Sequence, residues 1–247
     1  MTRNVIALHG FTQVGASWDA VGVALSSLLP SIRFLTPDMP GHGSRSHDPL
    51  NLDQASDLLA EELPGGIWIG YSMGGRHLLN LALRHPDRCI GLVLVSTTAG
   101  IDDPDERAAR RRADAITADR IRSIGVNEFI REWTAQPMFD GRLDDVGELA
   151  TRLANTPDGL AGSLQQAGTG SQTPLWSDLG SIRVPTLIVT GSEDTKFTAI
   201  GDRLASCISG AAHEVLAGAG HALHLERPDE FASLVTKWIR QQFPDLR

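Results

Sequence analysis

Cysteine and lysine are scarce in this sequence of 247 residues. The two cysteines, Cys89 and Cys207, lie far apart and show no metal-like spacing. We therefore predict that both are small core residues rather than a disulfide or a metal site, as in a protein of the reducing cytoplasm. Lys196 and Lys237 are the only lysines, so nearly all basic charge is arginine, which suits bidentate binding of carboxylates.

Long apolar runs are also missing. No run approaches the roughly 20 residues of a membrane span, and residues 1–4 lead directly into a strand-like run without a secretory signal. The formal net charge of −8 argues against a nucleic-acid partner. The histidines show no ligand spacing beside a carboxylate, so neither a metal nor another cofactor is predicted. These absences favour a cytoplasmic protein with a small-molecule partner, as a monomer or a dimer.

Buried strands alternate with helices in the first hundred residues and again after residue 183. Apolar, β-prone runs predict strands at 4–8, 32–35, 67–69, 91–96, 184–191 and 212–216. Such alternation is typical of a parallel sheet covered on both faces. Between about 100 and 171 the pattern is helical only. We predict an α/β core formed by 1–99 and 171–247, with 100–170 inserted as a helical lid.

The predicted lid begins with a clear helix start, in which Asp103 is the N-cap and Pro104 is the first helical residue. An arginine-rich run follows, formed by Arg107, Arg110, Arg111 and Arg112. We expect most of these side chains on a solvated helix face. Helical spacing also allows one of the first three to turn inward toward an anion.

The stretch Gly70-Tyr71-Ser72-Met73-Gly74 has the pattern Gly-x-Ser-x-Gly. β-prone residues precede it at 67–69, and apolar residues at helical spacing follow at 76–83. A strand, a tight turn and a helix form the context in which this pattern makes a nucleophile elbow, with the serine held above the sheet. A glycine-rich turn in an ordinary α/β protein would show the same five residues, so the assignment depends on partners elsewhere in the chain.

Ser72 needs an imidazole to take its proton and a carboxylate to orient that imidazole. In elbow proteins these partners follow in the order serine, acid, histidine. Asp194 comes just after the predicted strand at 184–191, and Glu193 beside it is the weaker candidate. His221 lies in a glycine-flanked loop after the last strand, whereas His224 is predicted to be structural. The predicted catalytic set is therefore Ser72, Asp194 and His221.

An oxyanion hole should be formed by two backbone amides, one after the nucleophile and one in the loop after the first strand. Met73 follows Ser72, and His9-Gly10-Phe11 follows the first strand. We predict that the amides of Phe11 and Met73 form the hole. His9 is expected to hold this loop by hydrogen bonding.

Together these segments resemble the α/β-hydrolase superfamily over the whole length of the chain. The matching segments are 8–11 (Leu-His-Gly-Phe), 38–44 (Asp-Met-Pro-Gly-His-Gly-Ser), the elbow, 191–194 (Gly-Ser-Glu-Asp) and 220–221 (Gly-His). The resemblance implies the α/β-hydrolase fold: a mostly parallel sheet with helices on both faces and an inserted helical lid. We expect about six strands, fewer than is usual in the superfamily, because the first strand lies so near residue 1.

A narrower resemblance lies in and around the predicted lid. Its segments are 74–76 (Gly-Gly-Arg), 106–114 (Glu-Arg-Ala-Ala-Arg-Arg-Arg-Ala-Asp), 133–139 (Trp-Thr-Ala-Gln-Pro-Met-Phe), 168–172 (Gly-Thr-Gly-Ser-Gln), 175–176 (Leu-Trp) and 194–197 (Asp-Thr-Lys-Phe). This set is similar to the 2-succinyl-6-hydroxy-2,4-cyclohexadiene-1-carboxylate synthases of menaquinone biosynthesis. These lyases eliminate pyruvate from 2-succinyl-5-enolpyruvyl-6-hydroxy-3-cyclohexene-1-carboxylate.

The narrower resemblance also implies roles for individual residues. Arg110 and Arg152 would bind carboxylates of the substrate, and Trp133 would line the pocket. Tyr71 and Arg76 would support the substrate site from beside the elbow. Ser72 would act as a base, so no acyl-enzyme would form. Such a polycarboxylate substrate would be repelled by a net negative protein without local arginines.

Two other functions remain open at this point. A serine hydrolase of esters, or of carbon–carbon bonds in ring-cleavage products, would use the same catalytic residues. Such an enzyme should have a mainly apolar pocket and form an acyl intermediate, whereas the lyase should turn several arginines inward. A ligand-binding receptor on the same fold is disfavoured by the intact catalytic set. The direction of the lid arginines and a direct assay separate these functions.

Overall fold

The computed structural model describes residues 3–139 and 146–246. Six strands form one sheet in the order β2-β1-β3-β4-β5-β6, and every neighbouring pair is parallel. The strands are β1 Arg3–Leu8, β2 Ile32–Leu35, β3 Gly66–Tyr71, β4 Cys89–Val95, β5 Thr186–Gly191 and β6 Ala212–Leu216. The predicted number of strands is therefore confirmed for the described residues, and the α/β-hydrolase fold class is confirmed with it.

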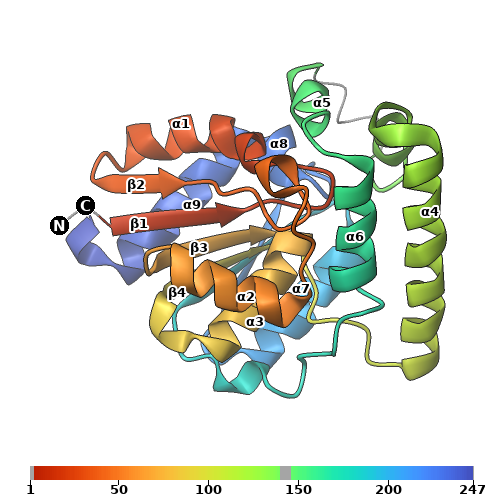
Figure 1. Ribbon diagram of the computed structural model, residues 1–247. Helices are drawn as coiled ribbons and strands as arrows, with labels where there is room; N and C mark the ends of the chain where they lie inside the picture. Colours follow the sequence, from red (N-terminus) through yellow and green to blue (C-terminus); the bar gives the residue numbers. More distant parts are fainter. Residues whose placement is uncertain (1–2, 140–145, 247) are drawn as a thin grey trace.

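Helices cover both faces of this sheet (Figure 1). One face carries α1 Asp19–Leu28, α8 Leu223–Glu226 and α9 Pro228–Gln242, and the other carries α2 Leu52–Glu62, α3 Met73–Arg84 and α7 Thr195–Cys207. Alternate residues of each strand point to opposite faces, so the strands contribute to two separate hydrophobic clusters. The short helix α8 ends at Glu226, and the closing helix α9 begins at Pro228.

β3 lies near the centre of the sheet and is buried along its whole length. Its last residue, Tyr71, is in register with Val95 of β4, and Val95 is in register with Val189 of β5. Because parallel strands end at the same edge of a sheet, the segments after β1, β3, β4 and β5 come together there. Ligand sites of open parallel sheets form at this edge.

Three helices lie across that edge: α4 Pro104–Thr134, α5 Val146–Arg152 and α6 Pro157–Ala167 (Figure 1). The predicted start of α4 is confirmed, since the Asp103 carboxylate accepts hydrogen bonds from two amides of the first turn. A kink divides α4 at Gly125, where φ is 77°. The described part of 100–170 contains helices and no strand. The boundaries that separate core from lid stay a prediction.

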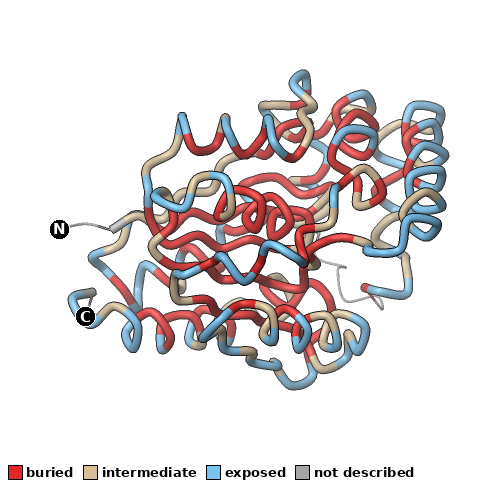
Figure 2. The backbone as a smooth tube through the Cα atoms, turned by 90° about the horizontal axis from the view of Figure 1, so that it is seen from below, coloured by how far each residue is buried: buried red, intermediate tan, exposed pale blue. Residues whose placement is uncertain are grey.

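α4 and α6 pack together through an apolar cluster of their own, formed by Ile121, Phe129, Ile130, Leu160 and Leu164. The opposite side of α4 is exposed along most of its length (Figure 2). The lid therefore buries one side of α4 over the sheet and leaves its charged side in water, as the arginine-rich run predicted.

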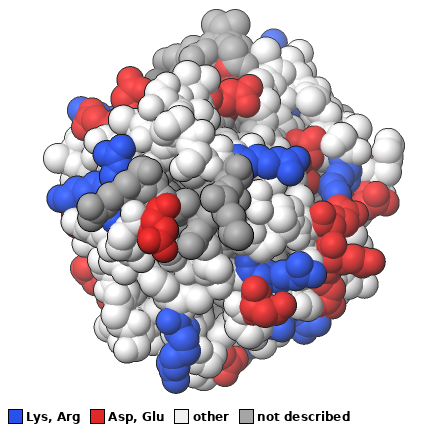
Figure 3. All heavy atoms as spheres, turned by 90° about the vertical axis from the view of Figure 1, so that its left-hand side faces the viewer, with Lys and Arg blue, Asp and Glu red and all other residues white. Residues whose placement is uncertain are grey.

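The surface opposite the lid carries no broad area of one charge among the residues described there. Basic and acidic side chains are interspersed on this face (Figure 3). None of the helices formed by the described residues combines the length and apolarity that a bilayer crossing demands.

Candidate active site

Ser72 lies at the sharp turn between β3 and α3, with φ 49° and ψ −106°. This conformation is strained for a residue with a side chain. The neighbouring glycines are required by close approach. A Cβ at Gly70 would lie 2.7 Å from the Gly74 carbonyl oxygen, and one at Gly74 would lie 2.3 Å from the Leu8 carbonyl oxygen. The Gly-x-Ser-x-Gly pattern therefore lets the turn pack against β1 while Ser72 projects from it.

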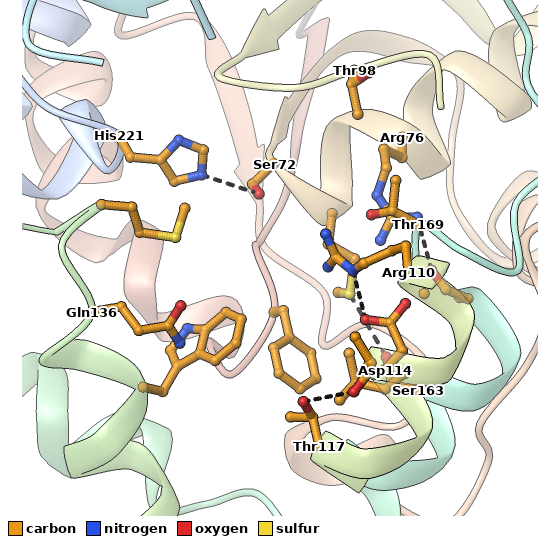
Figure 4. Close-up of a pocket in the computed structure, with 18 of the residues that line it drawn as sticks. Ser72, Arg76, Thr98, Arg110, Asp114, Thr117, Gln136, Ser163, Thr169 and His221 are labelled. Carbon is orange, nitrogen blue, oxygen red and sulfur yellow. Dashed lines mark hydrogen bonds and ion pairs between the residues drawn. The ribbon is translucent and has the colours of Figure 1, made fainter. Parts of the chain in front are cut away.

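His221 lies within hydrogen-bond distance of both other predicted catalytic residues. His221 Nε2 is 3.3 Å from Ser72 Oγ (Figure 4), and His221 Nδ1 is 2.6 Å from Asp194 Oδ2. A carboxylate can only accept hydrogen bonds, so His221 Nδ1–H donates to Asp194 and Nε2 is left to accept from the serine hydroxyl. This arrangement allows proton transfer from Ser72 Oγ to the imidazole.

Local structure holds the Asp194 carboxylate in place. Asp194 is the N-cap of α7, and its Oδ1 accepts a hydrogen bond of 3.2 Å from the Phe197 amide. The Phe197 ring lies against the His221 ring, with 4.5 Å between centroids. Glu193, the weaker candidate from the sequence, is exposed and accepts a hydrogen bond from Ser192. The structure therefore places Asp194, and not Glu193, against the imidazole.

The loop after β1, which carries Phe11, is fixed by hydrogen bonds of His9 and Gln13. His9 Nδ1–H donates to the Gly10 carbonyl, and His9 Nε2 accepts from the Met39 amide at 2.9 Å. The Gly10 amide donates a hydrogen bond of 2.8 Å to Gln13 Oε1. Burial lowers the pKa of His9 to about 4, so the ring is neutral as these bonds require.

The Met73 amide begins α3 and therefore has no acceptor within the helix. Phe11 and Met73 both line the same cavity as Ser72 and His221. This geometry suits two amides that stabilise a negative oxygen beside the serine. Their role as an oxyanion hole stays a prediction.

A cavity of about 600 Å³ separates the sheet edge from the lid helices. Ser72 and His221 line one side, and Arg76 and Arg110 line another (Figure 4). Trp133 lines it too, next to Phe11, with 5.0 Å between the two ring centroids. The size is that of a pocket for a small organic ligand.

Arg76 and Arg110 bring two positive charges to this cavity. Arg76 is buried and donates from Nη1 to the Ala167 carbonyl at 2.8 Å and to Gln172 Oε1 at 3.1 Å. Burial, together with the nearby Arg110 charge, lowers the pKa of Arg76 to about 10, so it stays protonated at neutral pH. Arg110 Nε donates to Asp114 Oδ1 at 2.7 Å.

Of the three lid arginines that helical spacing allowed to turn inward, Arg110 lines the cavity. Arg107 instead donates to the carbonyls of Ile101 and Asp102, and Arg111 donates to the Gly170 carbonyl. Sequence spacing alone did not distinguish these three, because they share one side of the helix.

Arg152, predicted to bind a substrate carboxylate, and Tyr71, predicted to support the substrate site, do not line the cavity that the described residues form. Arg152 is 1% exposed, pairs with Glu148 at 2.9 Å and hydrogen-bonds Thr12 Oγ1. The guanidinium is held by a carboxylate one turn earlier on α5, and its contact with the substrate stays a prediction. Tyr71 is buried, with its ring centroid 4.2 Å from that of His224, and burial raises its pKa. Tyr71 therefore supports the catalytic-histidine loop from behind.

Sequence reasoning assigned no role to several other residues that line the cavity. Lys196 and Phe197 lie two and three positions after Asp194, so their closeness to the predicted acid was an available signal. Arg120 and Glu132 form an ion pair of 2.5 Å across the kink of α4. No local pattern marks that pair, since the kink at Gly125 decides which residues meet.

Comparison with known proteins identifies a family, related sequences and a similar solved structure. The sequence pattern of the alpha/beta hydrolase family matches residues 5–234. A protein of Bacillus subtilis (strain 168), provisionally named 2-succinyl-6-hydroxy-2,4-cyclohexadiene-1-carboxylate synthase, is 36% identical, covering 95% of this chain and 89% of its own length. The synthase of that name from Enterobacter sp. (strain 638) is 31% identical, covering 98% and 93%. The structure of MenH from S. aureus superposes with a TM-score of 0.91 at 28% identity, covering 98% of this chain and 95% of that chain.

Proposed function

Since this chain belongs to the alpha/beta hydrolase family, we propose that it is a lyase that eliminates pyruvate from 2-succinyl-5-enolpyruvyl-6-hydroxy-3-cyclohexene-1-carboxylate. The product is 2-succinyl-6-hydroxy-2,4-cyclohexadiene-1-carboxylate, the compound in the names of its relatives. One observation carries the proposal: a serine paired with an imidazole lines the same cavity as the guanidinium groups of Arg76 and Arg110. A pocket for neutral esters needs no such arginines.

The first step is binding of a substrate with several carboxylates. The chain has a formal net charge of −8, which repels such a substrate at long range. Arg76 and Arg110 supply local positive charge at the cavity wall. Guanidinium groups pair with carboxylates through two parallel hydrogen bonds, so they orient the substrate as well as attract it.

The second step is proton abstraction. Ser72 Oγ, whose own proton passes to His221 Nε2, removes a proton from the substrate ring, and Asp194 stabilises the imidazolium that results. The electrons of the broken C–H bond at C2 of the ring form a C2=C3 bond, the C3=C4 bond shifts to C4=C5, and the bond from C5 to the enolpyruvyl oxygen breaks. The departing enolpyruvate takes the proton held by His221 and becomes pyruvate. The amides of Phe11 and Met73 stabilise the enolate-like oxygen that develops on the way.

Direct assays separate this lyase from a serine hydrolase. We expect the protein to release pyruvate from the cyclohexene substrate and to hydrolyse short-chain esters far more slowly. Ser72→Ala should reduce pyruvate release by about 10²- to 10⁴-fold, the contribution of general-base catalysis. Ser27→Ala makes the same change on the exposed side of α1 and serves as the control.

Two results would contradict the proposal. Full pyruvate release by Ser72→Ala would remove the serine from the mechanism. Rapid ester hydrolysis with a trapped acyl-enzyme, and no pyruvate from the cyclohexene substrate, would identify a hydrolase. A cytoplasmic location belongs to the same proposal, because the two cysteines of the protein are unpaired thiols, as the reducing cytoplasm favours.

A further inference from the structure

Asp114 places a carboxylate on the wall of a cavity that otherwise suits carboxylate ligands. It belongs to α4, is 5% exposed and lines the same cavity as Ser72. A buried negative charge there should weaken the binding of any anion. The proposed reaction assigns Asp114 no role, so its position calls for a physical explanation.

Both oxygens of the Asp114 carboxylate are engaged. Oδ1 accepts from Arg110 Nε at 2.7 Å, one helical turn away. Oδ2 lies 3.4 Å from the Gly170 amide, on the segment after α6. Figure 4 shows the Arg110 side chain reaching from α4 into the cavity, with Asp114 behind it. Because the contact uses Nε, the two terminal nitrogens of Arg110 are left to face a ligand.

The glycines of residues 168–170 allow this contact. A Cβ at Gly168 would lie 2.6 Å from Asp114 Oδ2, and a Cβ at Gly170 would lie 2.3 Å from the Arg111 amide nitrogen. Any larger residue would push this segment away from α4. The Gly-Thr-Gly pattern noted in the sequence therefore has a steric reason.

The same segment holds a second arginine of the cavity, Arg76. Arg76 Nη1 donates to the Ala167 carbonyl and to Gln172 Oε1. Residues 167–172 thus fix Arg76 directly and Arg110 through Asp114. Two guanidinium groups from different helices are held in one relative orientation by this short segment.

We propose that Asp114 is a positioning residue that orients Arg110 to bind a substrate carboxylate. This inference rests on the proposed lyase function. Asp114 reduces the positive charge of the cavity, but it also removes the rotational freedom of a long side chain before the substrate arrives. The ordering of the Arg110 side chain outweighs the repulsion between Asp114 and the substrate, because the Arg110 guanidinium already points at its ligand.

Ordering of Arg110 by Asp114 strengthens substrate binding, whereas the negative charge of Asp114 weakens it. Asp114→Asn therefore shows which effect is larger. If Asp114 positions Arg110, this change raises KM for the cyclohexene substrate by roughly ten-fold, the size of one charge-assisted hydrogen bond. kcat should change little, because Arg110 binds a part of the substrate that does not react. If Asp114 only neutralises charge, the same change lowers KM.

A double-mutant cycle with Arg110→Ala provides the second readout. In the Arg110→Ala background, Asp114→Asn should no longer raise KM, and it should lower KM by removing an uncompensated carboxylate. Asp119→Asn is the matched control, since Asp119 lies on the same helix, is 81% exposed and is outside the cavity. It should leave KM and the melting temperature unchanged.

A binding measurement separates failure of this proposal from failure of the proposed reaction. Calorimetric binding of succinate to the same proteins measures the carboxylate site even if no pyruvate is released. If Asp114→Asn does not fold, Asp114→Glu keeps the charge but displaces the oxygens, and it should weaken succinate binding and raise KM. An unchanged or lower KM in a folded Asp114 variant, or equal effects of Asp114→Asn with and without Arg110, would overturn the proposal.

Discussion

Acidification is expected to destabilise this protein through two buried histidines, His9 and His42. Both are fully buried. His9 Nε2 accepts from the Met39 amide, so its protonation would place two N–H donors face to face. His42 Nδ1 donates to the Pro40 carbonyl, and its Nε2 has no partner among the described residues. The folded state therefore requires both rings to be neutral.

The size of the effect follows from the pKa values. Burial lowers the pKa of His9 from 6.5 to about 4, and burial together with His9 lowers that of His42 to about 3. Because both folded values are depressed, their contribution is complete above pH 6.5 and is lost as the pH falls toward 4. Between pH 7.5 and 5.0, linkage gives a loss of about 2 kcal/mol for each histidine. The sum, about 4 kcal/mol, is a large part of a typical stability of about 5–15 kcal/mol.

Chemical unfolding at the two pH values measures this loss. His42→Gln removes one of the two groups, so the variant should lose about 2 kcal/mol less than the wild type between pH 7.5 and 5.0. His47→Gln is the control, because His47 is exposed, and it should keep the full loss. Acid effects of carboxylates cancel in this comparison. If His42→Gln loses as much stability as the wild type, His42 is not held neutral by burial.

Two further predictions concern packing at the elbow and the buried ion pair. Gly74→Ala should lower the free energy of unfolding by about 1–3 kcal/mol and reduce pyruvate release, because its Cβ would meet the Leu8 carbonyl. Gly180→Ala is the control, because a Cβ there would have its nearest neighbour at 3.9 Å, and it should change neither stability nor pyruvate release. Equal losses of unfolding free energy in the two variants would contradict this reasoning. Glu148→Gln leaves the Arg152 guanidinium uncompensated at 1% exposure, so we expect a loss of about 3–5 kcal/mol in unfolding experiments. A raised KM with an unchanged melting temperature would instead support the substrate contact that the sequence predicted for Arg152.

The elbow and the catalytic candidates could be predicted because their signals are local. The sequence 70–74 has glycines where the turn brings backbone atoms too close for a side chain. Asp194 and His221 each follow a strand, and parallel strands end at one edge. A chain that alternates strands and helices has few ways to arrange those ends. The approximate position of all three residues therefore follows from order along the chain.

The fate of the arginines could not be predicted in the same way. Arg107, Arg110 and Arg111 have similar local surroundings in the sequence, yet Arg110 alone of the three lines the cavity. Arg152 was expected beside them and is instead paired with Glu148 in the interior. Periodicity indicates which side of a helix a residue occupies, but not which other segment packs there.

The sequence by itself determined the order of strands and helices, the strained serine turn and the three polar residues that meet beside it. Only the tertiary structure decided which arginines line the cavity and how Asp114, which hydrogen-bonds Arg110, is held in place. Asp114 meets Gly170, 56 positions further along the chain, and Arg76 meets Gln172, 96 positions further along. Contacts over such separations depend on how the lid folds back over the sheet. Backbone propensity and side-chain periodicity act within a few residues, so they carry no information about these long-range contacts.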